Sequence, residues 1–330
     1  MATIGISLGD PAGIGPEVVV RALAARPAVP AVVYGDRGVL DRAAAAAGVP
    51  ALAHHQIVAV TNLGAAEVVA GRPNDVSGRA QLDYLDAATD AALAGRIAGL
   101  VTAPISKAWI ARAGFTFPGH TEYLAARAGG VPVAMMLAGP RLRVTVATTH
   151  IALRDVARVL TPEQIASAVV LTARALQDAF GLHRPRVAVA GLNPHAGEEG
   201  RFGDEEGRLV TPALELARAR LAAERLDVEL SGPHVPDAVF RLAALGRFDA
   251  VVALYHDQGL IPVKLLHFDD AVNVTLGLPF VRTSPDHGTA YDIAGRGVAR
   301  PDSFLAALDL AARLALPGNA ASDGGAPHPG

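Results

Sequence analysis

The chain has 330 residues, which corresponds to about two domains at roughly 150 residues each. Lys and Arg number 29 and Asp and Glu 32, so the net charge of −3 provides no basic surplus for binding nucleic acid. Hydrophobic residues make up 51% and charged residues 18%, a composition typical of a folded globular protein and unlike a disordered chain. There is no cysteine, which excludes disulfides, thiolate metal ligands and a cysteine nucleophile.

The sequence contains neither a membrane-spanning pattern nor a secretory signal. No uninterrupted apolar run reaches the ~20 residues that span a bilayer, and the first residues lack a basic segment. We therefore expect a soluble, cytoplasmic protein with no membrane and no nucleic-acid partner. Residues 317–330 are mainly Gly, Ala, Ser, Asp and Pro without an apolar period, which predicts a disordered tail.

Short Val- and Ile-rich runs alternate with longer Ala, Leu and Arg stretches of helical period. This alternation predicts an α/β fold with βα units around a mostly parallel sheet. The predicted strands are Thr3–Leu8, Ala31–Tyr34, Ile57–Val60, Gly99–Thr102, Val131–Leu137, Val144–Ala147, Arg186–Ala190 and Ala250–Leu254. The clearest predicted helices are Gln81–Ile97, Pro162–Phe180, Pro212–Ala223 and Phe304–Ala315. Thr161 before Pro162 is typical of a helix N-cap followed by Pro at the first helical position.

A segment rich in glycine and proline, Gly9–Glu17, follows the first predicted strand and opens a helix. Its backbone amides could face an anion. It matches neither the Gly-x-Gly-x-x-Gly fingerprint nor a phosphate loop, because no Gly-Lys-Ser/Thr follows. On the residues alone, a tight strand-to-helix turn is the better interpretation.

Three histidines each follow an apolar strand: His150, His195 and His256. Neighbouring parallel strands end at the same sheet edge, where α/β proteins bind ligands. Three imidazoles there can meet around one divalent cation, such as zinc or cobalt, either in one subunit or across a dimer contact. The alternative is that each is a loop histidine bonded to a backbone carbonyl. Asp257 either orients His256 as a ligand, bonds the metal-bound group, or caps a helix.

Further polar residues lie in loops and in apolar segments. Gly119–Glu122 forms a polar loop, and Lys264, Asn273 and Arg282 supply two cations and an amide among Val, Leu and Phe. Cations in such surroundings require anionic partners. These partners are either a ligand or one of the aspartates Asp269, Asp270 and Asp286. The segment from Ser284 to Gly297 is dense in Gly, His and Asp, and could surround a ribose or an adenine.

Taken together, six motifs resemble the 4-hydroxythreonine-4-phosphate dehydrogenase family of pyridoxal phosphate biosynthesis, from Gly9 to about Ala315. The motifs are Gly9–Glu17, Gly119–Glu122, Thr148–Ile151, Leu192–Glu198, Tyr255–Leu260, and Asn273–Pro279 leading into Arg282-Thr283-Ser284. The first motif and the 286–297 loop also resemble the isocitrate and isopropylmalate dehydrogenases. The resemblance implies a non-Rossmann fold of two α/β/α domains with a central cleft.

The resemblance also implies roles for the two domains. Residues 1–125 with 270–316 would bind the nucleotide, and residues 126–269 would carry the metal, the substrate and the dimer contact. The implied homodimer has a shared active site, with the partner subunit supplying part of the metal site.

The resemblance assigns functional residues by position. The implied metal ligands are His150, His195 and His256, and the metal is zinc, magnesium or cobalt. The implied substrate-binding residues are His120, Thr121, Lys264, Asn273 and Arg282, with Lys264 and Asp257 as the catalytic candidates. The implied NAD- or NADP-binding residues are His287, Gly288, Thr289, Ala290 and Asp292.

The implied reaction is oxidation of 4-phosphooxy-L-threonine, a phosphorylated hydroxy acid, by NAD or NADP. The resulting β-keto acid loses carbon dioxide and leaves 3-amino-2-oxopropyl phosphate. After Lys264 the chain departs from the usual Gly-rich stretch of the family, which affects substrate contacts. The alternatives are a dehydrogenase of D-threonate or D-erythronate 4-phosphate, a cis-dihydrodiol dehydrogenase of the same fold, or a metal-dependent hydrolase or aldolase that needs no nucleotide.

Overall fold

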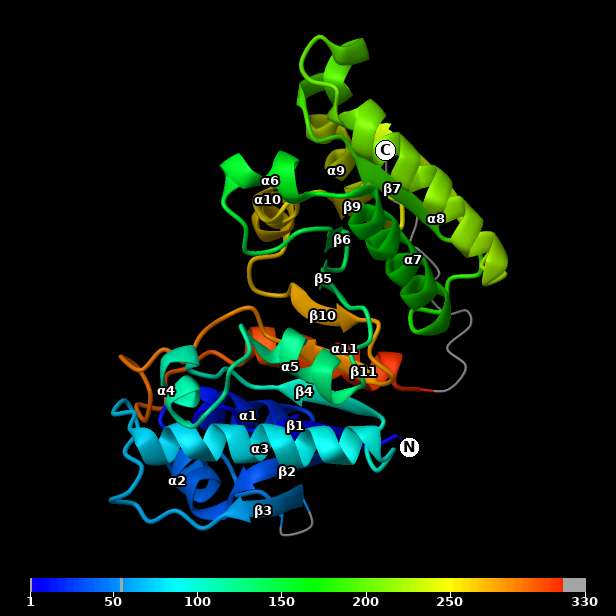
Figure 1. The fold of residues 1–330 in the computed structure, drawn as a ribbon. Coiled ribbons are helices and arrows are strands. Elements are labelled where there is room, and N and C mark those ends of the chain that lie inside the picture. The colour runs from blue at the N-terminus through cyan, green and yellow to red at the C-terminus, as the bar shows by residue number, and fades with distance from the viewer. Residues whose placement is uncertain (1, 54–55, 317–330) are drawn as a thin grey trace. The chain divides into compact units, whose positions relative to one another are not determined.

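The computed structural model describes residues 2–53 and 56–316 (Figure 1). The predicted tail at 317–330 lies outside the described residues. The chain divides into two compact units. The first contains Met1–Val133 and His267–Ala315, and the second contains Ala134–Leu266, so the chain builds part of one unit, completes the other and then returns.

The first unit has a sheet with the strand order β3-β2-β1-β4-β11-β10. Its strands are β1 (Ile4–Ser7), β2 (Ala31–Asp36), β3 (Ile57–Thr61), β4 (Gly99–Thr102), β10 (Val272–Leu276) and β11 (Val281–Ser284). All neighbours pair in parallel except β10 and β11, which are antiparallel. The helices are α1 (Gly15–Ala25), α2 (Arg37–Ala47), α3 (Asp75–Leu93), α4 (Lys107–Arg112), α5 (His120–Arg127) and α11 (Asp302–Leu314).

The core of the first unit forms because its central strands are buried on both faces. All four residues of β1 are buried, as are all four of β4. Continuous apolar runs of this kind are typical of parallel strands covered by helices on both faces. Helix α3 packs on β1, β2, β3 and β4 and contributes Leu85 to a cluster with Leu100 and Leu124, whereas α11 packs against β4, β10 and β11.

The second unit has a sheet with the strand order β5-β6-β9-β7-β8. Its strands are β5 (Ala134–Ala138), β6 (Arg143–Val146), β7 (Arg186–Ala190), β8 (Glu229–His234) and β9 (Ala250–Ala253). Only the pair β5 and β6 is antiparallel. The helices are α6 (Leu153–Val159), α7 (Pro162–Asp178), α8 (Thr211–Ala223), α9 (Pro236–Ala244) and α10 (His256–Leu266), with a 3-10 segment at Pro194–Gly200 and a π segment at Glu206–Val210. Helices α7 and α8 pack against one another in this unit (Figure 1).

The structure confirms the predicted α/β class, and each predicted strand is present with shifted or identical ends. Helix α3 begins at Asp75, earlier than the predicted Gln81, because Asn74 and Ser77 form a capping box. The Thr161 N-cap is also present and forms a capping box with Gln164.

Three strands were not predicted: β8, β10 and β11. Strand β8 reads Glu-Leu-Ser-Gly-Pro-His and contains no residue in the buried class, so it has no apolar pattern to detect. Strands β10 and β11 carry Asn273, Thr275 and Arg282 between apolar residues. In the part of the chain that the structure describes, no helix combines the length and the apolar character that a bilayer crossing requires.

Candidate active site

The three histidines lie at one edge of the sheet in the second unit. Strands β6, β9 and β7 are parallel neighbours in that order. His150 follows the carboxyl end of β6, His256 that of β9, and His195 that of β7. This is the edge where open α/β sheets bind ligands.

His150 and His256 come together in this unit. Their ring centroids are 5.6 Å apart with the planes tilted by 41°. His256 Nδ1 lies 2.7 Å from Asp257 Oδ1. A proton on Nδ1 satisfies that contact and leaves the Nε2 lone pair for a metal, as in carboxylate–histidine–metal arrangements. Asp257 is thus placed to orient His256, one of the three roles considered from the sequence.

His195 has a different environment. Its side chain is 66% exposed, with Nδ1 3.4 Å from Glu198 Oε2, and its ring meets the ring of Phe202 edge-on at 5.8 Å. All five residues His195–Glu199 have positive φ angles, between 42° and 82°. Such a conformation costs about 1–2 kcal/mol for each non-glycine residue, a type of strain that is concentrated at functional sites.

Imidazole nitrogens suit a divalent ion such as zinc or cobalt, so the donor set of these histidines fits the expected metal. Across residues 2–53 and 56–316, however, no three His, Asp or Glu side chains are grouped as metal ligands. The structure therefore brings together two of the three predicted ligands, His150 and His256. The third, His195, follows the adjacent strand β7, and its side chain is exposed.

Arg282 is buried in the first unit among hydroxyl groups. Its side chain on β11 is 3% exposed, and it donates to Thr275 Oγ1 at 2.9 Å and to Thr102 Oγ1 at 2.7 Å. Burial lowers the pKa of Arg282 to about 10, while the Glu122 carboxylate acts in the opposite direction. Two of the three aspartates considered from the sequence have other partners: Asp269 lies 3.5 Å from Arg300, and Asp270 lies 3.1 Å from His267.

Several buried polar atoms near Arg282 have no hydrogen-bond partner among the described residues. They are Arg282 Nε, His120 Nε2 and Asn273 Oδ1. The pKa of His120 is well below its usual range because the ring is desolvated and because Arg282 and Lys107 are positively charged. His120 is therefore a neutral imidazole. Buried polar groups in this state require a ligand or water to satisfy them, and the local positive charge favours an anion.

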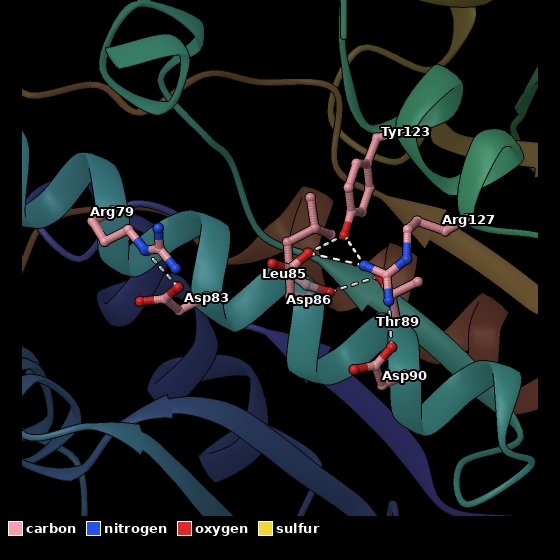
Figure 2. Close-up of polar contacts among 8 residues, drawn as sticks. All are labelled: Arg79, Asp83, Leu85, Asp86, Thr89, Asp90, Tyr123 and Arg127. Carbon is pink, nitrogen blue, oxygen red and sulfur yellow. Dashed lines mark hydrogen bonds and ion pairs between the residues drawn. The ribbon is translucent and has the colours of Figure 1, made fainter. Parts of the chain in front are cut away.

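Helix α5, which begins at His120 and Thr121, is held onto α3 by polar contacts (Figure 2). Tyr123 donates its hydroxyl to Asp86, and Arg127 forms ion pairs with Asp86 and Asp90. Figure 2 shows both α5 side chains pointing toward the α3 carboxylates. Burial and the Asp86 contact raise the pKa of the Tyr123 hydroxyl, so it remains a donor. These contacts fix the middle and the C-terminal end of α5 against α3.

The predicted nucleotide loop packs onto the turn after β1 in the first unit. Ile14 N–H donates to Thr289 O at 2.9 Å, and Gly295 N–H donates to Glu17 Oε1 at 2.5 Å. A Cβ at Gly13 would lie 2.9 Å from Thr289 O, so glycine permits this close approach. Gly9–Glu17 forms the expected strand-to-helix turn, and this loop is one of the segments that it contacts.

The predicted nucleotide residues differ in exposure. His287 is half-buried, and its Nε2 is another buried atom without a partner in the described structure. Gly288 and Asp292 are exposed, while Thr289 and Ala290 are half-buried. Ala290 has φ of 41°, a left-handed conformation that is uncommon for a residue other than glycine.

Sequence reasoning missed three residues at these sites: Lys107, Asp10 and Tyr291. Lys107 starts α4 just after the carboxyl end of β4, and its charge reaches His120. Asp10 is fully buried and accepts hydrogen bonds from Ala12 N–H and the Tyr291 hydroxyl. The sequence did contain a signal for Lys107 and Asp10, because both lie shortly after the carboxyl end of a predicted strand. Lys264, predicted as a substrate ligand, lies half-buried on α10 of the second unit.

Comparison with known proteins identifies the family. Residues 27–311 match the family model of pyridoxal phosphate biosynthetic protein PdxA. The 4-hydroxythreonine-4-phosphate dehydrogenase of Desulfosudis oleivorans is 49% identical over 328 residues, covering 93% of this chain and 94% of that protein.

Two solved structures are also similar. A 4-hydroxythreonine-4-phosphate dehydrogenase from Klebsiella pneumoniae has a TM-score of 0.86 and 40% identity, covering 96% of this chain and 100% of that one. A terephthalate 1,2-cis-dihydrodiol dehydrogenase from Burkholderia xenovorans has a TM-score of 0.69 and 32% identity, covering 94% of this chain and 98% of that one. The family match and the extent of these similarities lead to one conclusion: the chain belongs to the family of pyridoxal phosphate biosynthetic protein PdxA.

Proposed function

We propose that the chain oxidises 4-phosphooxy-L-threonine with NAD or NADP in a reaction that depends on a divalent metal. The product is a β-keto acid that decarboxylates to 3-amino-2-oxopropyl phosphate. The observation that carries the metal-dependent part is the placement of His150, His256 and His195 after three adjacent parallel strands, with the rings of His150 and His256 5.6 Å apart.

His150, His195 and His256 would hold the metal, which is zinc, magnesium or cobalt. Bound there, a divalent ion lowers the pKa of the substrate hydroxyl and stabilises negative charge on the carbonyl oxygen during decarboxylation. Asp257 orients His256 through the contact at Nδ1. The incomplete grouping within one chain is consistent with a site completed by a partner subunit.

We assign binding of the substrate anions to five residues: His120, Thr121, Lys264, Asn273 and Arg282. The unpartnered atoms of His120, Asn273 and Arg282 supply hydrogen-bonding capacity, and the two cations supply charge for the phosphate and carboxylate. Because His120 is neutral, its imidazole can accept a hydrogen bond from a substrate hydroxyl or donate one to a phosphate oxygen.

The dinucleotide would bind at His287, Gly288, Thr289, Ala290 and Asp292. When bound, its nicotinamide would accept the hydride from the substrate C–H bond. The role of the protein in this step would be to orient the two reactants. Ile14 N–H donates to Thr289 O, so the loop is anchored to the turn after β1. Asp292 is exposed and could accept hydrogen bonds from ribose hydroxyls. The proposal thus assigns nucleotide binding to residues 1–125 and 270–316 and metal binding to residues 126–269. Of the proposed substrate-binding residues, only Lys264 belongs to 126–269.

A homodimer belongs to the same proposal. In the second unit, large apolar side chains are exposed on α10 and α6: Ile261 at 66%, Leu265 at 83% and Leu153 at 69%. Exposed apolar residues of this size favour a covered surface, and a second copy of the chain would cover it. A cytoplasmic location fits an enzyme that uses phosphorylated metabolites and a nicotinamide cofactor.

The experiment that tests the reaction is NAD and NADP reduction by the purified chain, with added metal, before and after chelation. 4-Phosphooxy-L-threonine is compared with D-threonate 4-phosphate, D-erythronate 4-phosphate and a cis-dihydrodiol, because a dihydrodiol dehydrogenase shares 32% identity. We expect chelator-sensitive turnover of the threonine ester. Turnover of another substrate alone would assign a different reaction to the same site, and no reduction with any of them would reject the dehydrogenase proposal.

The metal set has its own test. His195→Ala should abolish both metal binding and turnover, whereas His183→Ala, which removes a histidine before β7 at the other end of the strand, should change neither. A His195→Ala variant that retains full turnover would show that this residue is not a ligand.

A further inference from the structure

Three buried polar side chains of the second unit connect the strand ends that lead to the histidines. The first is Thr148, which is 4% exposed and lies two residues before His150. Its Oγ1 donates to Leu254 O at 2.7 Å, and Leu254 lies two residues before His256. This bond therefore joins the end of β6 to the end of β9.

The second side chain, Gln258, makes the next connection. Its Oε1 accepts from Leu254 N–H at 2.7 Å, and its Nε2 donates to Gly191 O at 2.7 Å. Gln258 as a whole is 9% exposed, and both the oxygen and the nitrogen of its side-chain amide are hydrogen-bonded to backbone groups. Gly191 follows β7 directly, so Gln258 joins the end of β9 to the segment that carries His195.

The third side chain, Glu206, holds that segment in place. Glu206 is 5% exposed, and its Oε1 accepts from Leu192 N–H at 2.8 Å and from Asn193 N–H at 2.7 Å. Its Oε2 accepts from Asn193 Nδ2 at 3.0 Å. These three bonds fix the chain immediately before the left-handed run that contains His195.

These contacts occur where the backbone ladder of the sheet ends. The last paired positions are Val146 with Ala253 and Val189 with Val252. Beyond them, the N–H and C=O of Leu254 and the C=O of Gly191 are bonded by side chains instead of neighbouring strands. Leaving such buried groups unpaired costs about 1–3 kcal/mol each. The side chains therefore supply the hydrogen bonds that a neighbouring strand would otherwise make.

We propose that Thr148, Gln258 and Glu206 form a brace that holds in place the strand ends that carry His150, His256 and His195, and thereby tunes metal affinity whether the ligands of one ion come from one chain or from two. The proposal rests on the proposed function, because it takes these histidines as the metal ligands. The three are positioning residues: their bonds end on backbone and on Asn193. Outer residues that orient metal ligands typically contribute about 10–100-fold to metal affinity, and the brace acts at the same level through the backbone.

The test compares full-length variants by calorimetric titration with Co²⁺ and by thermal unfolding of the metal-free protein. Gln258→Met keeps the length of the side chain and removes both bonds, and Thr148→Val keeps the shape and removes one. The matched control is Gln177→Met. Gln177 on α7 also bridges two backbone carbonyls, His183 O at 3.0 Å and Asp227 O at 2.8 Å, near the residues that enter β7 and β8 at the opposite edge of the sheet.

We expect Gln258→Met to weaken Co²⁺ binding by about tenfold or more, and Thr148→Val to weaken it by less. Gln177→Met should lower the unfolding temperature without changing the affinity for Co²⁺. The KM for NAD should be unchanged in all three, since the predicted nucleotide residues lie in the other unit. A change of metal affinity with an unchanged KM for NAD distinguishes positioning from general destabilisation.

Wild-type Co²⁺ affinity in Gln258→Met and Thr148→Val would overturn the brace while leaving the metal-dependent function intact. Equal loss of affinity in Gln177→Met, or variants that are unfolded at the assay temperature, would also overturn it, because the brace would then be a stability element only. Failure of the wild-type chain itself to bind Co²⁺ would reject the metal site of the proposed function together with the brace.

Discussion

Tyr291 donates its phenolic hydrogen to Asp10 Oδ2 over 2.5 Å, joining the 286–297 loop to the turn after β1. Asp10 also accepts from Ala12 N–H at 2.9 Å and from Gln81 Nε2 at 3.2 Å. Gln81 in turn accepts from Ser106 N–H at 2.8 Å. The loop predicted to bind the nucleotide is thus tied to three other segments of the first unit through one buried carboxylate.

Tyr291→Phe removes only the hydroxyl and therefore tests that connection. We expect a loss of about 1–3 kcal/mol in unfolding free energy, because the buried Asp10 carboxyl group loses a hydrogen-bond partner, and a several-fold rise in the KM for NAD or NADP. The KM for substrate should change less. Tyr84→Phe is the matched control, because Tyr84 is a buried tyrosine of the same unit whose hydroxyl contacts Thr61. An equal rise in cofactor KM in both variants would show that the loop does not depend on the Asp10 contact.

Asp10 also predicts a pH dependence of stability. Burial raises the pKa of Asp10 above its usual value of 3.8, despite the hydrogen bonds that act to lower it. A carboxyl group whose pKa is raised by folding stabilises the protein while protonated. That contribution is complete below pH 3.8 and is lost as the pH rises through the folded-state pKa.

The measurement is urea unfolding of the wild type and Asp10→Asn between pH 4 and 7. The free-energy advantage of the wild type over Asp10→Asn should shrink as the pH rises across this range, because only the wild type loses a proton at position 10. An advantage that grows with pH would mean that the hydrogen bonds outweigh burial and that the pKa is lowered.

The contacts between α5 and α3 predict how His120 is held. Tyr123→Phe removes the hydroxyl bond to Asp86 and should cost about 1–3 kcal/mol in unfolding free energy. It should also raise the KM for substrate modestly, since α5 carries His120 and Thr121 at its start. The measurements are chemical unfolding and steady-state kinetics with each substrate varied in turn.

The control for this prediction lies on α3, the helix that carries Asp86. Arg79 forms an exposed ion pair with Asp83 at 2.8 Å on α3 (Figure 2). Arg79→Ala should change the unfolding free energy by no more than about 0.5 kcal/mol, as is usual for exposed pairs, and leave both KM values unchanged. A substrate KM that is unaffected by Tyr123→Phe would show that α5 is positioned by packing alone.

The sequence predicted the β6, β7 and β9 strands and the histidines that follow them, because a buried parallel strand is a continuous apolar run and its end is marked by polar residues. It could not predict β8, whose Gly232 and Pro233 read as a turn, or the 5.6 Å approach of His150 and His256. Strand order determines that distance, and strand order depends on contacts between residues far apart in the chain.

The roles of Asp10 and Lys107 escaped prediction for a related reason. Each lies beside a short strand, but its importance comes from partners more than ten positions away: Tyr291 for Asp10, and His120 for Lys107. A composition or periodicity pattern describes neighbours along the chain, whereas these pairs form only when the loop and α5 fold onto the sheet. Arg282 was identified because a cation in an apolar segment is unusual in itself, although its threonine partners were not.

Arg282 provides the most direct test of the anion site. Arg282→Met keeps much of the apolar volume but removes the guanidinium, which donates to Thr275 and Thr102 and has an unpartnered Nε among the described residues. We expect the KM for the phosphorylated substrate to rise by about tenfold or more, corresponding to a lost charge-assisted bond of about 1.5–3 kcal/mol, with little change in the KM for NAD or NADP. The same substitution should raise the pKa of His120, because the neighbouring positive charge that lowers it is gone. An NMR titration of His120 reads this shift independently of turnover. If cofactor KM rises instead while the His120 titration is unmoved, Arg282 serves the nucleotide and the anion site must lie elsewhere.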